Sequence, residues 1–118
     1  MTYALLIYSR LTPGESLSPE REERVLVEHR ALQEETARAG TLKAVSRLAD
    51  TRGACTVRVS GGDVNITDGP FMETKEWLVG FYVVDAASRD EAVAHARRLL
   101  PDETHCIEVR PVDWHRDT

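Results

Sequence analysis

The segment Asp68–Glu76 reads DGPFMETKE and separates two stretches that are rich in β-forming residues. Asp-Gly-Pro is a turn signal, because Gly69 tolerates backbone angles that other residues avoid and the proline after it biases it away from the α region. Pro70 fixes its own φ angle and offers no N–H donor. The segment therefore predicts a defined turn that holds Asp68 and Glu73 at the edge of a sheet.

Apolar or alternating segments on both sides of this turn predict the strands of that sheet. The expected strands are 3–8, 41–48, 55–60, 63–67, 77–85 and 105–109. Gly61-Gly62 is a two-residue hairpin signal between the third and the fourth of them. This hairpin is polar on one face, so we expect it at a margin of the sheet. Gly80 interrupts the strand 77–85 and indicates a bulge or a close backbone approach.

Two helices are expected between these strands. The first begins at Pro19 after the N-cap residue Ser18 and runs to about Ala39, where Gly40 stops it. At about 3.6 residues per turn, the buried stripe of this helix includes His29. The second helix follows a capping box at positions 88–91, and a proline at position 101 ends it.

The order of these elements is βαββαβ with an inserted β-hairpin, which is the ferredoxin-like α+β sandwich in a single domain of residues 1–118. Two helices cover one face of such a sheet, yet the strands 3–8 and 77–84 are apolar on both faces. A monomer would expose a large apolar patch, so we expect a homodimer packed sheet to sheet. The alternative is a monomer whose C-terminal tail covers the open face, but that tail is short and polar.

Composition excludes several classes of partner. The 118 residues carry a net charge of −5, which argues against nucleic-acid binding. No apolar run approaches the roughly 20 residues that span a bilayer, and the N-terminus has no basic region of the kind found in signal peptides. Cys55 and Cys106 form no CxxC pair. We therefore expect free thiols in a reducing cytoplasm, with no membrane or nucleic-acid partner.

The motif DGPFMETKE closely resembles the signature of the DGPF family, part of the larger YCII-related superfamily, in which alanine usually stands where this chain has Met72. The resemblance extends over nearly the whole chain. It implies a dimeric α+β barrel. Many members have no assigned activity, and members often resemble partners of extracytoplasmic-function sigma factors by genomic neighbourhood, which implies a regulatory role as an alternative to catalysis.

The resemblance also implies a pair of catalytic residues. In the superfamily a helix histidine and an aspartate near the sheet end are proposed to form an active-site dyad, and His29 and Asp68 match those positions. A carboxylate that accepts a hydrogen bond from one imidazole nitrogen fixes the tautomer and raises the basicity of the other nitrogen. The alternative is that His29 is a satisfied histidine at the edge of the core and that Asp68 caps its own turn.

Other residues of the motif are candidates for contact with a substrate: Gly69, Pro70, Phe71, Glu73 and Lys75. Lys75 would bind an anion, and Glu73 would act as a second acid or orient the substrate. The structural alternative for these two is a surface ion pair or a cap. Phe71 and Trp77 are candidates for an apolar pocket wall, although aromatic residues beside a strand are more often part of the core.

No metal or organic cofactor is expected. The four histidines lack ligand spacing, and the chain has no phosphate loop, Rossmann glycine pattern or nucleophile elbow. We therefore expect a cytoplasmic homodimer that acts on an unidentified small molecule through a His-Asp acid–base dyad. The alternative is a non-catalytic module that binds a small molecule or regulates a partner such as an extracytoplasmic-function sigma factor.

Overall fold

The computed structural model describes residues 1–72 and 74–117. Its two helices are α1 (Pro19–Ala39) and α2 (Arg89–Arg98), and a 3₁₀ turn, η1, spans Thr51–Gly53. Its strands are β1 (Thr2–Ser9), β2 (Leu42–Arg47), β3 (Cys55–Ser60), β4 (Asp63–Asp68), β5 (Trp77–Asp85) and β6 (His105–Pro111). Neither helix has the length and apolar character that a membrane span requires in this part of the chain.

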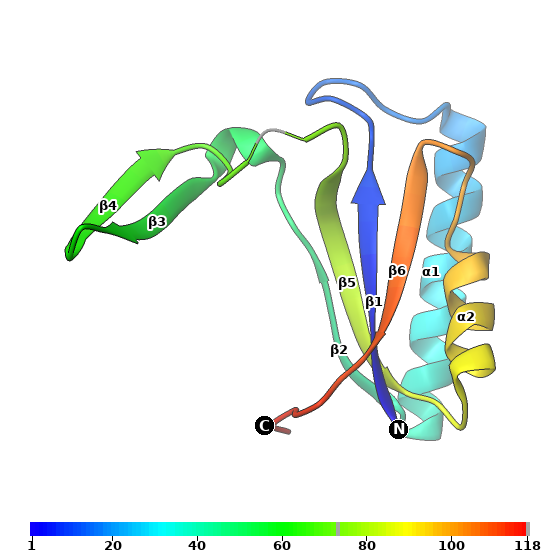
Figure 1. Cartoon of the computed structure of the whole chain (residues 1–118). Coiled ribbons are helices and arrows are strands. Elements are labelled where there is room, and N and C mark those ends of the chain that lie inside the picture. Colours follow the sequence, from blue (N-terminus) through cyan, green and yellow to red (C-terminus); the bar gives the residue numbers. More distant parts are fainter. Residues whose placement is uncertain (73, 118) are drawn as a thin grey trace.

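Four strands form the main sheet in the order β2-β5-β1-β6, and every neighbouring pair is antiparallel. Both helices lie on one face of this sheet, and the other face is not covered by any helix (Figure 1). The architecture is α+β and is compatible with the ferredoxin-like arrangement that the sequence predicts.

The core lies between the helices and the sheet, and strict alternation along the strands builds it. In β1 every second residue is buried, from Tyr3 to Ser9, while the residues between them are only half-buried. Leu5 pairs with Tyr82, and these two side chains are 0% and 1% exposed. The helices contribute Leu32, Thr36, Ala92, Ala96 and Leu99 to the same layer. The register therefore assigns Tyr82 to the helix-covered face and its neighbour Phe81 to the open face.

The predicted ends of α1 are confirmed. Ser18 Oγ accepts a hydrogen bond from the Arg21 N–H, which satisfies one of the free donors of the first turn. Gly40 ends the helix in the left-handed conformation at φ 74°, and its N–H bonds to Ala37. These two caps bound a helix of 21 residues that runs the length of the sheet.

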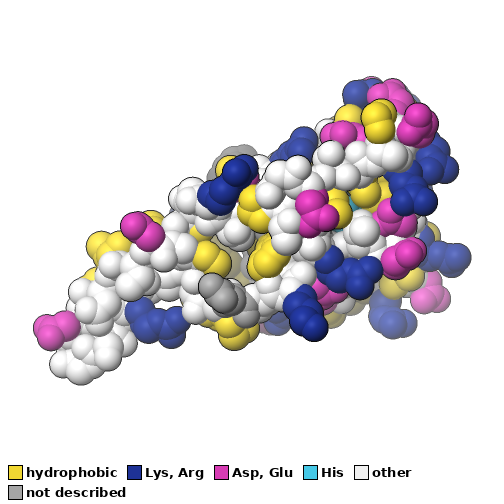
Figure 2. Space-filling view, turned by 90° about the horizontal axis from the view of Figure 1, so that it is seen from above, with side chains coloured by type: hydrophobic (Ala, Val, Ile, Leu, Met, Phe, Trp, Pro, Cys, Tyr) yellow, Lys and Arg dark blue, Asp and Glu magenta, His cyan; other side chains and the backbone are white. Residues whose placement is uncertain are grey.

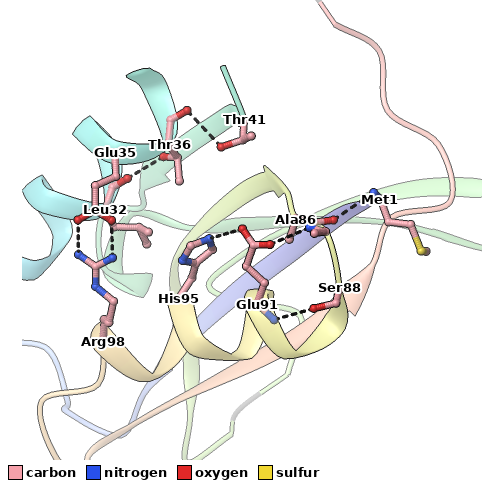
Figure 3. Close-up of polar contacts among 11 residues, drawn as sticks. Met1, Leu32, Glu35, Thr36, Thr41, Ala86, Ser88, Glu91, His95 and Arg98 are labelled. Atoms are coloured by element: carbon pink, nitrogen blue, oxygen red, sulfur yellow. Dashed lines mark hydrogen bonds and ion pairs between the residues drawn. The ribbon is translucent and has the colours of Figure 1, made fainter. Parts of the chain in front are cut away.

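Polar contacts join the two helices on their outer side (Figure 3). The guanidinium of Arg98, at the end of α2, donates to Glu35 at 2.6 Å and to Glu28 at 3.1 Å, both on α1. At the start of α2, Ser88 Oγ accepts from the Glu91 N–H, as the predicted capping box requires. The Glu91 carboxylate returns to the N–H of Ala87, one residue before the cap.

The β3–β4 hairpin projects away from the body of the protein, as Figures 1 and 2 show. It forms a separate two-stranded sheet, so the expectation that it would lie at a margin of the main sheet was wrong. The η1 turn lies between β2, the last strand of the main sheet before the hairpin, and β3. Val57 pairs with Ile66 and Val59 with Val64, which puts four apolar side chains that are 64–69% exposed on one face of the hairpin.

Gly80 lies at a close backbone approach, as its position in the sequence predicts. A Cβ atom at this position would lie 2.8 Å from the carbonyl oxygen of Ser46 in β2. The pairing of β1 with β5 also shifts register here, between Ile7 and Tyr8. The absence of a side chain at Gly80 thus permits the close approach of β2 to β5. It also accommodates the register shift between β1 and β5.

The DGPF turn starts with Gly69 at φ 98°, a conformation that L-residues with side chains rarely adopt. Two hydrogen bonds hold this glycine: its N–H donates to Ala54 at 2.7 Å, and its carbonyl accepts from the Thr56 hydroxyl at 2.8 Å. The turn is therefore tied to the first residues of β3.

Gly69→Ala is expected to lower the free energy of unfolding by about 1–3 kcal/mol, because alanine is strained at positive φ. Gly53→Ala is the matched control, since both sites leave room for a Cβ atom and Gly53 has no positive φ. Urea unfolding of the two variants measures the difference. Equal midpoints would show that the turn relaxes at no cost.

Candidate functional site

A cavity of about 550 Å³ opens between α1 and the ends of the sheet strands. We call it the α1 cavity. Its walls come from α1, the segment 11–17 that precedes α1, the ends of β1, β2 and β5, and residues 48–51. The polar or aromatic groups that matter here are Ser9, His29, Arg47, Trp77, Tyr82 and His105. A volume of this size suits a small organic ligand, because ligand pockets typically enclose about 300–1,000 Å³.

The helical repeat of α1 places His29 in the cavity wall. Leu32 and Thr36, which follow on the same face, are 0% and 3% exposed, and His29 lies half-buried one turn before Leu32. The position that the apolar stripe predicts for His29 is thus confirmed.

The imidazole of His29 contacts Tyr82, on β5. The His29 Nδ1 atom lies 2.7 Å from the Tyr82 Oη atom, and the two rings stack with centroids 5.7 Å apart and an interplanar angle of 18°. Gln33, one helical turn after His29, donates from Nε2 to the same Tyr82 oxygen at 3.2 Å. Two side chains of α1 thus converge on one hydroxyl group of the sheet.

The electrostatic surroundings favour the neutral imidazole. Burial lowers the pKa of His29, and the positive charges of Arg47 and of protonated His105 lower it further. Burial also lowers the pKa of His105, although Asp102 opposes this effect. Burial raises the pKa of Tyr82, while the hydrogen bond from Gln33 partly offsets the rise. His29 and Tyr82 are therefore both uncharged near neutral pH.

The outer wall of the cavity is anchored by the segment before α1. The indole Nε1–H of Trp77 donates to the carbonyl of Leu11 at 2.8 Å, and the Leu11 N–H donates to Ser9 Oγ at 3.0 Å. Trp77 is thus both a wall of the cavity and the link between β5 and this segment. Of the two interpretations that the sequence leaves open for Trp77, a pocket wall and a core residue, this placement agrees with the first.

The DGPF residues lie elsewhere. Asp68 is exposed at the end of β4, where it pairs with Cys55. Phe71 is 69% exposed, and Pro70 and Lys75 are exposed as well. Glu73, a predicted substrate contact, lies outside the described residues. The cavity is lined by the first helix, as predicted, but by none of the motif residues that the structure describes.

Within residues 1–72 and 74–117, no hydrogen bond joins His29 to Asp68; Tyr82 takes the place next to Nδ1. The His29–Asp68 dyad and the substrate contacts of the DGPF turn therefore stay predictions. Over the same residues, no group of three or more His, Cys, Asp or Glu side chains is arranged to hold a metal ion. Cys55 and Cys106 are exposed free thiols.

Sequence reasoning did not identify Tyr82, Gln33, Arg47 or His105 as parts of a site. The i,i+4 spacing of His29 and Gln33 was a usable signal, because it puts two polar side chains on one helix face next to the buried stripe. No local pattern distinguishes Tyr82 from the other apolar residues of its strand, since its partner lies 53 positions away.

The fold and the cavity together define an α+β protein with one histidine and one tyrosine paired at the wall of a ligand-sized cavity. The model of the YCII-related domain matches residues 1–114, and the chain therefore belongs to the YCII-related family. It is also similar to an uncharacterised protein of Rhizobium meliloti (strain 1021), with 44% identity over 114 residues that cover 95% of this chain and 92% of the relative. The family resemblance that the sequence carries is thus confirmed.

Arg47→Gln is expected to raise the pKa of His29, because a positive charge that disfavours the imidazolium is removed while burial is retained. The lowest pH at which His29 is still neutral then moves upward. NMR titration of the His29 ring measures the shift. Arg89→Gln is the control, since this arginine is exposed at the start of α2 and its charge does not act on His29. An unchanged or lowered pKa of His29 in Arg47→Gln would contradict the electrostatic assignment.

Proposed function

We propose that the protein binds a small organic molecule in the α1 cavity and acts on it by acid–base chemistry centred on His29, without a metal or an organic cofactor. The observation that carries this proposal is the contact between His29 and Tyr82 at the cavity wall. A titratable group with a shifted pKa in a ligand-sized cavity is the usual mark of a functional site.

Histidine suits such a role because its ordinary pKa of about 6.5 lies close to neutral pH. A positioned acid or base contributes typically about 10²–10⁴-fold to a reaction rate. Elimination, isomerisation and hydrolysis are the reaction classes that one such group can assist. The apolar side chains around His29, such as Leu26 and Trp77, would hold the body of the ligand and exclude water.

The predicted dyad of His29 with Asp68 is a second candidate for the arrangement of this site. Asp68 precedes Gly69, which is bonded to Ala54 directly after η1, and Thr51 of η1 lines the cavity. A movement of the hairpin root would be needed to bring the carboxylate to the cavity, because Asp68 is not among the residues that line it. The two candidates differ in one consequence: Asp68→Asn lowers the pKa of His29 only if the carboxylate is its partner.

A non-catalytic role is the alternative function, either as a small-molecule-binding module or as an accessory protein linked to an extracytoplasmic-function sigma factor. The observation in its favour is the projecting hairpin, whose apolar face of Val57, Val59, Val64 and Ile66 is available for contact with another protein. Turnover of a ligand that binds the α1 cavity distinguishes the enzyme from the module.

We also propose that the protein assembles as a homodimer in the cytoplasm, with the open faces of two main sheets packed together as in a dimeric α+β barrel. Leu6 pairs with Phe81 and Ala4 with Val83 on the face that no helix covers. A second copy would bury this apolar surface, while Glu108 and Arg110, which pair with Leu6 and Ala4 from the edge strand β6, would lie at the rim of the interface. The exposed free thiols Cys55 and Cys106 suit a reducing compartment.

A metabolite library screened by thermal shift is expected to yield ligands that stabilise the wild-type protein, because a ligand at 100 times its dissociation constant adds about 2.7 kcal/mol to the unfolding free energy. His29→Ala is expected to abolish turnover of any such ligand that is a substrate. Asp68→Asn tests the dyad in the same assay. A substrate turned over equally by wild type and His29→Ala would refute the proposed chemistry.

Phe81→Glu is expected to raise the dimer dissociation constant by more than about tenfold, or about 1.4 kcal/mol, because it places a charge in the proposed interface. Val27→Glu, at a side chain that is 49% exposed on α1, is the control. Light scattering measures mass, and circular dichroism checks the fold. A wild-type monomer at micromolar concentration would contradict the proposed assembly.

A further inference from the structure

We propose that Tyr82 and Gln33 are positioning residues that hold neutral His29 in its Nε2–H tautomer, so that the ligand group opposite His29 is a hydrogen-bond acceptor such as a carbonyl or carboxylate oxygen. The proposal rests on the proposed function of the α1 cavity for its ligand, but its first test needs no ligand.

The direction of the hydrogen bonds follows from the donors available. The Gln33 Nε2 atom can only donate, so Tyr82 Oη is the acceptor in the contact at 3.2 Å. The single hydroxyl proton of Tyr82 is then free to be donated, and His29 Nδ1 lies 2.7 Å away. Nδ1 must carry a lone pair to accept this proton, which leaves the ring proton of neutral His29 on Nε2.

The opposite tautomer leaves a buried donor without an acceptor. If Nδ1 carried the proton, Tyr82 Oη would accept from both His29 and Gln33, and its own proton would have no acceptor among the contacts of the described residues. Tyr82 is only 1% exposed, so solvent has little access to it. An unsatisfied buried donor costs about 1–3 kcal/mol, which is enough to select one tautomer of an imidazole.

The Nε2 atom of His29 is the nitrogen left for the ligand. It forms no hydrogen bond with residues 1–72 or 74–117, while its ring lines the cavity. An N–H group there can only donate, so a ligand amine or hydroxyl proton directed at it would be repelled, whereas an oxygen lone pair would be bound.

The charges near this nitrogen favour an anionic or polarised oxygen. Arg47 is the permanent cation whose charge acts on the imidazole, whereas His105 adds positive charge only when protonated, and burial lowers its pKa. Three carboxylates also line the cavity, but Glu15 accepts hydrogen bonds from Thr12, and Asp50 is paired with Arg52. Glu22 lies exposed in the first turn of α1. The positive charge of the cavity therefore lies near His29.

The consequence for chemistry is that neutral His29 acts as a donor that stabilises negative charge on a ligand oxygen. The lone pair on Nδ1 is occupied by Tyr82, so in the proposed acid–base chemistry neutral His29 takes the part of the hydrogen-bond donor and acid, not of the base. A neutral imidazole that polarises a carbonyl is an established catalytic device.

Nitrogen-15 NMR of the histidine rings at about pH 8, well above the ordinary histidine pKa of about 6.5, tests the tautomer directly. The His29 signals, assigned by their loss in His29→Ala, are expected to show a protonated, pyrrole-like Nε2 and an unprotonated, pyridine-like Nδ1. A pyrrole-like Nδ1 in the wild-type protein would overturn the proposal.

Gln33→Glu tests the positioning role, because a carboxylate accepts the Tyr82 proton and reverses the chain of hydrogen bonds. The protonated nitrogen of His29 is then expected to change from Nε2 to Nδ1. Gln33→Met is the matched control: it removes the amide donor but adds no acceptor, so the fraction of the Nε2–H tautomer should fall without the protonated nitrogen changing to Nδ1. An unchanged tautomer in Gln33→Glu would show that Gln33 and Tyr82 are merely structural.

Tyr82→Phe gives an independent test of the same role, since loss of the hydroxyl should leave a mixture of both tautomers.

Benzoate and benzylammonium, which share a ring and differ in the charge and polarity of the attached group, test the ligand class. Benzoate is expected to bind at least about tenfold more tightly and to shift the His29 Nε2 signal, as a charge-assisted hydrogen bond requires. Preference for benzylammonium, or binding of neither probe, would overturn the ligand class. The tautomer result and the turnover of His29→Ala are separate readouts, so failure of this inference and failure of the proposed function can be told apart.

Discussion

The contact between the Tyr82 hydroxyl and His29 Nδ1 is the interaction on which the site depends. It joins α1 to β5, the strand that lies between β1 and β2 in the sheet. The contact gives a polar partner to one nitrogen of half-buried His29, and His29 and Gln33 together satisfy the hydroxyl group of buried Tyr82. The pairing allows a titratable ring to remain beside the apolar core, with one nitrogen hydrogen-bonded and the other without a hydrogen bond to the residues that the structure describes.

The cavity exists because the end of the sheet next to this contact departs from regular packing. Gly80 brings the backbone of β5 close to Ser46, and the register of β1 against β5 shifts beside it. At the end of β5 beyond this register shift, the Trp77 indole N–H donates a hydrogen bond to the carbonyl of Leu11. This bond holds the segment 11–17, which forms an outer wall of the cavity. A regular strand with a side chain at position 80 could not make the same approach, so Gly80, which itself lines the cavity, shapes the site through the backbone.

Much of the fold could be predicted from local patterns, because those patterns have local physical causes. Ser18 and Gly40 mark the ends of α1 through hydrogen bonds within a few residues, and the alternation in β1 reports which face is covered. The turn of the hairpin was correctly placed at Gly61 and Gly62, but the hairpin was wrongly expected at a margin of the main sheet, since no local signal shows that it forms a sheet of its own. His29 was identified because apolar residues recur at the helical period on its face of α1.

Its partner Tyr82 was not found from the sequence, because the contact depends on the register of β5 under α1 and is purely tertiary. The same reason applies to Arg47 and His105, which reach the cavity from strand ends. The motif led instead to Asp68. In the structure this residue lies opposite Cys55 in the ladder of β3 and β4. A motif identifies a family, whereas the residues of a site are decided by which side chains the packing brings together.

A crystal structure of the protein at a resolution that places the His29 ring and its neighbours independently is the most direct test of this account. The account predicts the Tyr82 hydroxyl at hydrogen-bonding distance from Nδ1, Gln33 bonded to the same oxygen, and Nε2 open to the cavity. A structure in which the Asp68 carboxylate, from the same chain or from a second copy, occupies the place next to Nδ1 would contradict it.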